Sequence, residues 1–279
     1  MLGFATATDN CCEITLPNIY SADMCTLVTL RRPNHDWPLI VAANRDEMID
    51  RPWTPPDRHW PDRDNVTAGQ DTLAGGTWLG VNDDGLIAGV LNRTGSLGPD
   101  PTLRSRGELP LEALDHAEAT VAAEALGDLD PSAYRPFNLF VGDARQAFWI
   151  SSVNEFGEPG MRVNEIPVGL SILTDCDLND VSSARVSRYL PEFRAAAAPT
   201  LGADAAQDDF SAWITLLCAK HTDEQAGTKG AMNIARGDGF GTVSSSLMAI
   251  PSLALAPQKP RWVFAAGAPD KAPFAPVLI

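Results

Sequence analysis

The sequence predicts an α+β fold in which antiparallel sheets carry helices on their outer faces. Its strand-like segments follow one another and are joined by short turns, as in antiparallel hairpins. Its helical segments fall in two separate blocks, and no glycine-rich phosphate loop follows a strand. These observations argue against an alternating βαβ arrangement. The length of 279 residues, with 44% hydrophobic residues and no break in composition, suits one large domain.

The charge and cysteine content narrow the class of protein. There are 36 acidic and 21 basic residues, a formal net charge of -15, so we expect no binding to nucleic acid or to anionic membranes. The five cysteines are irregularly spaced and do not cluster with histidines, so we expect free thiols and no metal site. No apolar run approaches a membrane span, and the first residues lack the pattern of a secretory signal. The sequence therefore predicts a cytoplasmic protein without an integral membrane segment.

The chain divides at Met24. Residues 1–23 show no hydrophobic period and are predicted to be a disordered leader or a mis-assigned start, whereas residues 24–279 form one domain. Residues 25–31 and 39–45 are predicted to pair as a hairpin across a turn at 33–38.

Residues 50–65 contain four prolines, and proline density predicts no regular structure there. Trp53 and Trp60 would pin this loop to the domain. The loop is either a packed surface segment or a wall of a substrate pocket, because long loops in compact domains are often functional.

A second hairpin is predicted at residues 77–82 and 86–92. Asp84-Gly85 supplies the positive φ angles that its turn needs, and the apolar second strand should be covered on both faces. Residues 108–126 have the composition and apolar stripe of one helix. The remaining predicted elements are strands at 138–143, 146–152, 169–174, 243–250 and 261–267, and helices at 182–198 and 208–221, with Pro191 as a kink.

Met24-Cys25 is the strongest candidate for a catalytic start. If translation begins at Met24, or if the leader is cleaved, trimming of the methionine leaves Cys25 as a terminal residue with its own amine. The reference pKa of an α-amine, about 7.7–8.0, lies close to that of a thiol, about 8.5. The amine can therefore accept the thiol proton without a histidine, which is the logic of an N-terminal nucleophile.

Asn44, Arg45 and Asp46 end the strand that is predicted to pair with Cys25. An arginine beside the thiol would favour the thiolate, and a carboxylate could hold the α-amine. Side chains alternate across a strand, so Asn44 and Asp46 share one face while Arg45 and Glu47 share the other. Both Arg45 and Asp46 reach the thiol only if the strand ends or bulges there. The alternative is a surface ion pair with a turn cap.

Several motifs together resemble the NRDE family, which is also called the transport and Golgi organisation protein 2 family. The resemblance covers residues 24–279 and implies the Ntn-hydrolase fold, a four-layer αββα sandwich with two antiparallel sheets between helix layers. The motifs are Met24-Cys25, Ala43-Asn44-Arg45-Asp46-Glu47, Arg51-Pro52, Gly75-Gly76-Thr77-Trp78-Leu79-Gly80 and Ser105-Arg106-Gly107-Glu108.

A more distant resemblance connects the chain to the choloylglycine hydrolases and penicillin V acylases. Residues 82–86 and 88–92 are similar to their Asn-x-x-Gly-Leu and Ala-Gly-Leu-Asn patterns, which implies that Asn92 is an oxyanion donor. Two positions depart from those enzymes. Asp175 stands where they carry an asparagine, and residues 244–246 are serines where they place an arginine.

The resemblance leaves two functions open. One is a cysteine N-terminal-nucleophile amidohydrolase that cleaves a linear, non-peptide amide, with Cys25, Arg45, Asp46 and Asn92 as catalytic residues and no cofactor. The substrate would contact Asn44, Trp53, Trp60, Trp78 and Asp175.

The other function is a non-catalytic protein that binds or carries haem or an acyl lipid on the same fold. Trp53, Trp60 and Trp78 would then hold the ligand, and His59 or Cys25 could be an axial ligand of haem. A papain-like pair of Cys176 or Cys218 with His221 is a third hypothesis, but no cysteine lies in a known protease signature.

Overall fold

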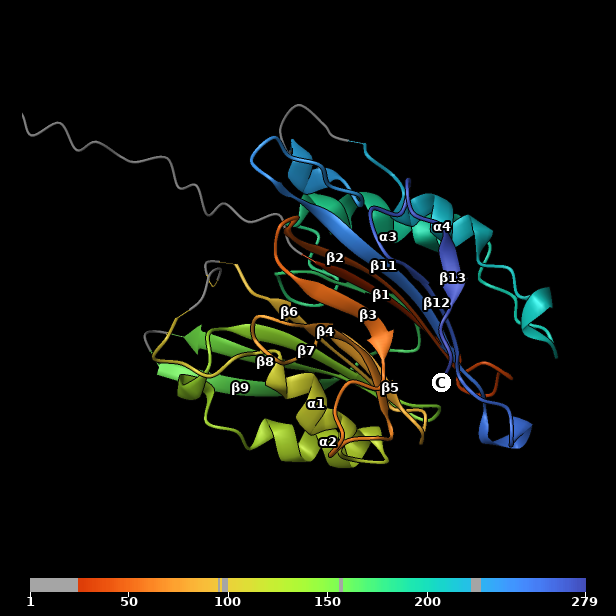
Figure 1. Ribbon diagram of the computed structural model, residues 1–279, viewed down its shortest axis with the longest axis horizontal. Coiled ribbons are helices and arrows are strands. Elements are labelled where there is room, and N and C mark those ends of the chain that lie inside the picture. Colours follow the sequence, from red (N-terminus) through yellow and green to blue (C-terminus); the bar gives the residue numbers. More distant parts are fainter. Residues whose placement is uncertain (1–24, 95, 97–99, 156–157, 222–226) are drawn as a thin grey trace, which may run out of the picture.

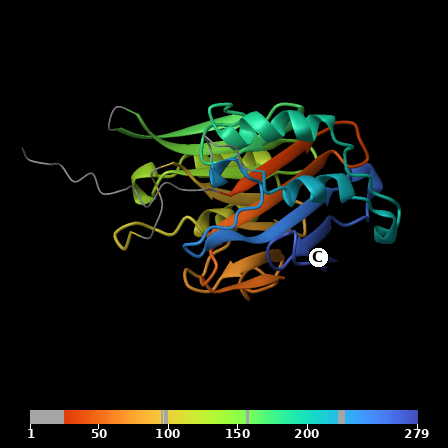
Figure 2. The same ribbon diagram turned by 90° about the horizontal axis from the view of Figure 1, so that it is seen from above.

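Two antiparallel sheets lie face to face, and helices cover the outer face of each (Figures 1 and 2). The structure is a computed structural model that describes residues 25–94, 96, 100–155, 158–221 and 227–279. The helices α3 and α4 pack on the six-stranded sheet, and α1 and α2 pack on the seven-stranded sheet (Figure 1). The predicted αββα sandwich is therefore confirmed. The predicted leader, residues 1–23, lies outside the described residues.

The six-stranded sheet has the order β10-β1-β2-β11-β12-β13, and the seven-stranded sheet runs from β3 to β9 in chain order. The strands of the first sheet are β1 (Thr26–Arg31), β2 (Leu39–Met48), β10 (Gly169–Leu173), β11 (Phe240–Ile250), β12 (Arg261–Ala265) and β13 (Phe274–Pro276). Those of the second are β3 (Trp53–Asp57), β4 (Val66–Asp71), β5 (Leu79–Asn82), β6 (Ile87–Asn92), β7 (Phe137–Gly142), β8 (Ala147–Glu155) and β9 (Glu158–Glu165). The α-helices are α1 (Glu108–Leu114), α2 (Ala119–Gly127), α3 (Ala184–Ala195) and α4 (Ser211–Leu217).

Strand alternation sorts the side chains of the six-stranded sheet into two layers. Leu27 and Val41 belong to the core between the sheets, together with Phe140 of the opposite sheet. Val28 and Ile40, which are their neighbours in sequence, pack against α3 and α4. The hairpin register pairs Thr26 with Asn44, and this register decides which side chains of β2 lie on the same face of the sheet as Cys25.

The proline-rich segment is not wholly irregular, contrary to the prediction. Trp53–Asp57 forms β3, which tolerates Pro55 and Pro56 because it is the edge strand of its sheet. The register with β4 shifts between Thr54 and Asp57, so the two prolines fall at an irregularity where no ladder donor is needed.

The helix that was predicted at 108–126 is broken into α1 and α2. The side chain of Asn82, on β5, donates hydrogen bonds to the carbonyl of Leu114 (3.0 Å) and to that of His116 (2.7 Å). These are carbonyls that the end of a helix leaves unsatisfied, so a long-range contact fixes the end of α1. The strands β4, β9 and β13 were also missed, whereas Pro191 is accommodated inside α3. In the described part of the chain no helix combines the length and apolar character needed to cross a membrane.

Candidate active site

Cys25 lies at the start of β1 with its side chain in the layer between the sheets. Its Sγ lies 3.4 Å from the backbone N of Asp46, which donates to it, and 3.6 Å from the Asp46 carbonyl oxygen. β2 does not end there but continues to Met48. Asp46 therefore contacts the thiol through its backbone, and of these two residues Arg45 is the one whose side chain shares the face of Cys25.

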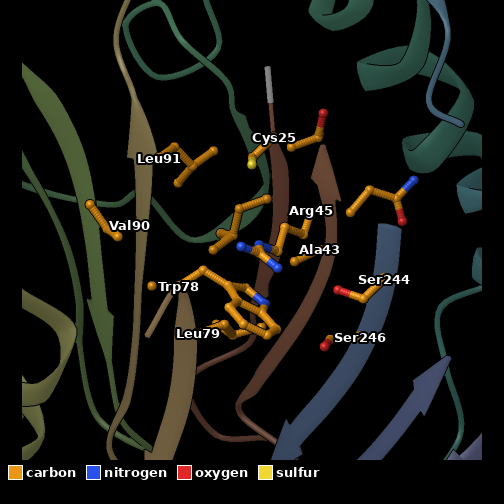
Figure 3. Close-up of a pocket in the computed structure, with 13 residues that line it drawn as sticks. Cys25, Ala43, Arg45, Trp78, Leu79, Val90, Leu91, Ser244 and Ser246 are labelled. Atoms are coloured by element: carbon orange, nitrogen blue, oxygen red, sulfur yellow. The ribbon is translucent and has the colours of Figure 1, made fainter. Parts of the chain in front are cut away.

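Arg45 is a buried cation beside the thiol. Figure 3 shows its side chain between Cys25 and Trp78, and its Cζ lies 4.0 Å from the centre of the Trp78 ring. Its Nη2 donates to Oδ2 of Asp71 at 3.2 Å. Its Nη1 is buried and has no acceptor within the described residues. A buried donor without a partner costs free energy because its hydration is lost. An oxygen of a bound ligand could accept from this nitrogen and offset that cost.

Asp71, at the end of β4, holds two of the cationic side chains of the site. Besides Arg45 it accepts from Nε of Arg51 at 2.6 Å, and its other oxygen accepts from the backbone N of Leu73 and of Ala74. The sequence reasoning gave this residue no role. The available signal was an aspartate at the start of a turn, which is common and does not identify its distant partners.

The Asp46 carboxylate faces the helix layer. Its Oδ2 lies 3.1 Å from Nη1 of Arg185, on α3, and its Oδ1 accepts from the hydroxyl of Thr242 at 2.6 Å. The same Arg185 nitrogen donates to the Thr26 hydroxyl at 2.6 Å. β11 shifts register between Thr242 and Ser244, so it is this strand that bulges opposite Arg45 and Asp46.

Asn44 has a similar position behind the site. Its amide nitrogen donates to the carbonyls of Leu217 (3.0 Å) and Met232 (2.9 Å), and its oxygen accepts from Ser245 at 2.7 Å. These contacts use the polar atoms of its side chain, on the face of the sheet opposite Cys25. The structure thus places Asn44 and Asp46 on one face and Arg45 on the other, as strand alternation predicts.

A cavity of about 320 Å³ opens beside Cys25. The ends of β2, β4 and β6 border it, together with the segment 100–107. Asn92, at the end of β6, lines this cavity, and within the described residues its side-chain amide makes no hydrogen bond. A much smaller space of about 20 Å³ lies between the sheets, and Cys25, Leu79, Ser244 and Ser246 are among the residues that line it (Figure 3).

The three tryptophans that were assigned to the substrate do not form one wall. Trp78 lines the cavity, and Trp53 packs behind it with ring centres 5.8 Å apart. Trp60 lies outside the lining residues, where its Nε1 donates to the Gly75 carbonyl at 3.1 Å. Asp175 is also outside the lining and accepts from the Thr94 hydroxyl at 2.5 Å.

Two glycine motifs cross at the opening of the cavity. A Cβ on Gly76 would lie 2.4 Å from the backbone carbon of Gly107, so no larger residue fits there. The backbone N of Thr77 donates to the Gly107 carbonyl at 2.9 Å across this crossing. The contact holds Arg106, which precedes Gly107, against the cavity that contains Cys25.

His59, the candidate axial ligand of haem, is not among the residues that line the cavity beside Cys25. Within the described ranges no group of three or more histidine, cysteine, aspartate or glutamate side chains could hold a metal. His59, the suggested axial ligand, has its Nε2 2.8 Å from the Pro55 carbonyl and 3.3 Å from the Thr54 hydroxyl, which are contacts within its own segment.

The thiol of Cys25 is neutral in the full chain. Burial, and then the negative charge of Asp46, raises its pKa to about 12, against the lowering effects of the Asp46 N–H and of Arg45. In this chain the nitrogen of Cys25 belongs to a peptide bond and carries no charge. A free α-ammonium would add a positive charge beside the sulfur, and such a neighbour lowers a thiol pKa by about 1–3 units.

Alkylation of Cys25 should therefore be faster when the chain begins there. We expect a rate at neutral pH roughly 4- to 40-fold higher than in the chain that keeps residues 1–24, after allowing for the weaker nucleophilicity of a more acidic thiol. The pH dependence of this alkylation should also shift to lower pH in the chain that begins at Cys25, because the α-ammonium lowers the pKa of the thiol. Site-resolved mass spectrometry after iodoacetamide measures this, with the partly buried Cys218 as internal control. Equal rates at Cys25 in both chains would contradict the expectation.

Comparison with solved structures supports the fold. An N-acylethanolamine-hydrolyzing acid amidase orthologue from Caenorhabditis elegans superposes with a TM-score of 0.54 at 14% identity, covering 85% of this chain and 98% of that one. A mutant of the conjugated bile acid hydrolase from Clostridium perfringens superposes with a TM-score of 0.50 at 11% identity, covering 91% and 97%. At such low identities the likeness shows a shared Ntn-hydrolase fold.

Comparison of sequences adds the family. The mouse "Transport and Golgi organization 2 homolog" is 33% identical over 110 residues, which are 38% of each chain. The human homologue is 33% identical over 114 residues, 39% of this chain and 40% of that protein. The match thus spans about two fifths of these curated relatives. The family model "Transport and Golgi organisation 2" matches residues 24–250. The chain belongs to the transport and Golgi organisation 2 family.

Proposed function

We propose that the protein is a cysteine N-terminal-nucleophile amidohydrolase that cleaves a linear, non-peptide amide. The observation that carries the proposal is the meeting of three groups at one cavity: the Cys25 thiol, the Arg45 guanidinium with its unsatisfied Nη1, and the Asn92 amide. The two structural neighbours that are named as hydrolases share the fold and support this class of reaction. The working chain begins at Cys25, directly after the Met24 at which the family match starts.

The reaction follows from the chemistry of a terminal cysteine. The α-amine accepts the thiol proton as Sγ attacks the carbonyl carbon of the substrate. The tetrahedral intermediate collapses, the C–N bond breaks, and the α-ammonium returns the proton to the leaving amine. Water then attacks the thioester with the amine as base, which releases a carboxylic acid and restores the thiol. Atoms and charges balance without a cofactor.

Arg45 and Asn92 would stabilise the charge that develops on the carbonyl oxygen. Among the described residues, Arg45 Nη1 is a buried cationic donor with no acceptor, and the amide of Asn92, which lines the same cavity, makes no hydrogen bond. Donors that are already in place when the oxyanion forms contribute most in a site that excludes water. Asp46 and Asn44 act from the opposite face, where their hydrogen bonds fix the end of β2.

A turnover assay tests the proposal. Protein that begins at Cys25 is incubated with a panel of N-acyl amides of varied acyl length, and release of the amine is measured. Hydrolysis of at least one member is expected, and Cys25→Ala should abolish it. Turnover that survives Cys25→Ala would refute the mechanism.

The carrier hypothesis predicts another pattern in the same samples. It requires binding without release of an amine, and for haem a shift of the Soret band on titration that His59→Ala or Cys25→Ala removes. Saturable binding of the intact amides with no turnover across the panel would contradict the hydrolase proposal.

A further inference from the structure

The cavity beside Cys25 is rich in arginine although the chain is acidic. Five arginines and four acidic residues line it, and the carboxylate of one of these four, Asp46, faces the helix layer instead, whereas the whole chain carries a net charge of -15. At physiological ionic strength charges are screened over about 8 Å, so the local charge decides which groups enter the cavity. An arginine without a nearby carboxylate is the one most able to bind an anionic group of a ligand.

Four of the five arginines each have a carboxylate oxygen within ion-pair distance. Asp71 lies 3.2 Å from a nitrogen of Arg45 and 2.6 Å from one of Arg51. Arg104 forms ion pairs of 2.7 Å with Glu108 and with Glu112, and these two glutamates do not line the cavity. The fourth, Arg135, lies 3.9 Å from a carboxylate oxygen of Asp100.

Arg106 differs from the other four arginines because its hydrogen-bond acceptors are neutral. Its Nη1 donates to the Ser96 carbonyl (3.0 Å), the Ser96 hydroxyl (2.9 Å) and the Pro136 carbonyl (3.0 Å). Across the described residues no carboxylate lies within ion-pair distance of Arg106, and its Nε and Nη2 make no hydrogen bond. The neighbouring residues 95 and 97–99, which the structure does not describe, are glycine, leucine, glycine and proline, so they add no carboxylate.

The electrostatic surroundings of Arg106 also suit an anion. Burial, and then the charge of Arg135, lowers its pKa to about 10, so it remains cationic at neutral pH but in an unfavourable environment. An anion near the two guanidinium groups would relieve their repulsion. The crossing of Gly76 and Gly107 fixes the backbone beside Arg106, so the cation is held in place before a ligand arrives.

We infer that Arg106 forms a subsite for an oxyanion group of the ligand, such as a carboxylate, in the cavity that also contains Cys25. The inference rests on the proposed function for its substrate class: the amide that is cleaved carries a negative charge at a distance from the scissile bond. The Nε and Nη2 groups of Arg106, which make no hydrogen bond within the described residues, can donate in parallel to the two oxygens of a carboxylate.

Matched substrates test the subsite in protein that begins at Cys25. One pair is an N-acyl glycine and its N-acyl glycinamide, and the other is a mono-amide of a long dicarboxylic acid and its methyl ester. The first pair places the charge on the amine side and the second on the acyl side. In at least one pair we expect kcat/KM to favour the anion by roughly 10- to 150-fold, the range for a hydrogen bond to a charged group.

Arg106→Gln should remove this preference, and Arg106→Lys should keep part of it, which separates loss of charge from loss of folding. Arg104→Gln is the matched control. It removes a guanidinium from the same cavity, but one already paired with Glu108 and Glu112, so the preference should persist. Equal rates for anion and neutral analogue in both pairs, or a preference that Arg106→Gln leaves intact, would overturn the inference.

Binding to the Cys25→Ala protein separates this inference from the proposed hydrolysis. Calorimetric titration with the same four compounds needs no turnover. Tighter binding of an anion that depends on Arg106 would support the subsite even if no compound is cleaved. Binding that is equal for anion and neutral analogue would refute the subsite even if hydrolysis is found.

Discussion

Replacing Asp46 with alanine is expected to lower the free energy of unfolding by about 3–5 kcal/mol. The side chain of Asp46 is 0% exposed and that of Arg185 is 4% exposed, and their charged atoms are 3.1 Å apart. Removing the carboxylate takes an ion-pair partner from the buried arginine and removes the hydrogen-bond acceptor of the Thr242 hydroxyl. Urea denaturation followed by circular dichroism measures the loss.

A surface pair provides the control for Asp46. The charged atoms of Glu118 and Arg145 are at a similar distance, 3.0 Å, but both side chains are more than half exposed, at 55% and 56%. Glu118→Ala should therefore change the free energy of unfolding by less than about 1 kcal/mol. Equal small effects of both substitutions would show that the Asp46–Arg185 pair does not stabilise the end of β2.

Asn92→Ala should reduce kcat for the best substrate by about 10²–10³, with little change in KM. The reason is that an oxyanion donor acts mainly in the transition state, where the carbonyl oxygen becomes charged. Asn92 lines the cavity and makes no hydrogen bond to the described part of the protein, so its removal should not unfold the sheet. Steady-state kinetics on protein that begins at Cys25 separates the two parameters.

Asn164→Ala is the matched control for Asn92. Asn164 is exposed on the edge strand β9 and does not line the cavity, so its replacement should leave kcat unchanged. If Asn92→Ala instead raised KM alone, Asn92 would bind substrate and the oxyanion role would pass to Arg45.

Much of the fold follows from patterns that are local in the sequence. Alternation predicted the hairpin of Cys25 and the opposite faces of Arg45 and Asp46, because the period of a strand is fixed by its backbone. The Asp84-Gly85 turn predicted the pairing of β5 with β6. In the structure Gly85 has the positive φ, 83°, that such a turn requires. These features need no knowledge of distant residues.

Other features depend on contacts between distant segments. The end of α1 is set by Asn82 of β5, and the helical propensity of residues 108–126 could not reveal it. β3 exists because it lies at a sheet edge, where prolines are tolerated, and edge position is a property of the assembled sheet.

The same limit applies to the site. Cys25 was predicted from its place after Met24, and Arg45 from its place on the strand that pairs with β1. Asp71 and Arg106 reach the cavity through a turn and through the backbone crossing at Gly76, which no periodicity encodes. The motif that contains Arg106 is visible in the sequence, but the lack of a carboxylate near Arg106 among the described residues depends on segments that are distant in the chain.

The most direct test of covalent catalysis by Cys25 is intact-mass analysis of a reaction quenched with acid within its first turnover. Protein that begins at Cys25 should gain the mass of the substrate acyl group, and peptide mapping should place that group on Cys25. The adduct should be absent from Cys25→Ala. Amine release without any acyl adduct on Cys25, or an adduct on Cys176 or Cys218 instead, would contradict the proposed mechanism.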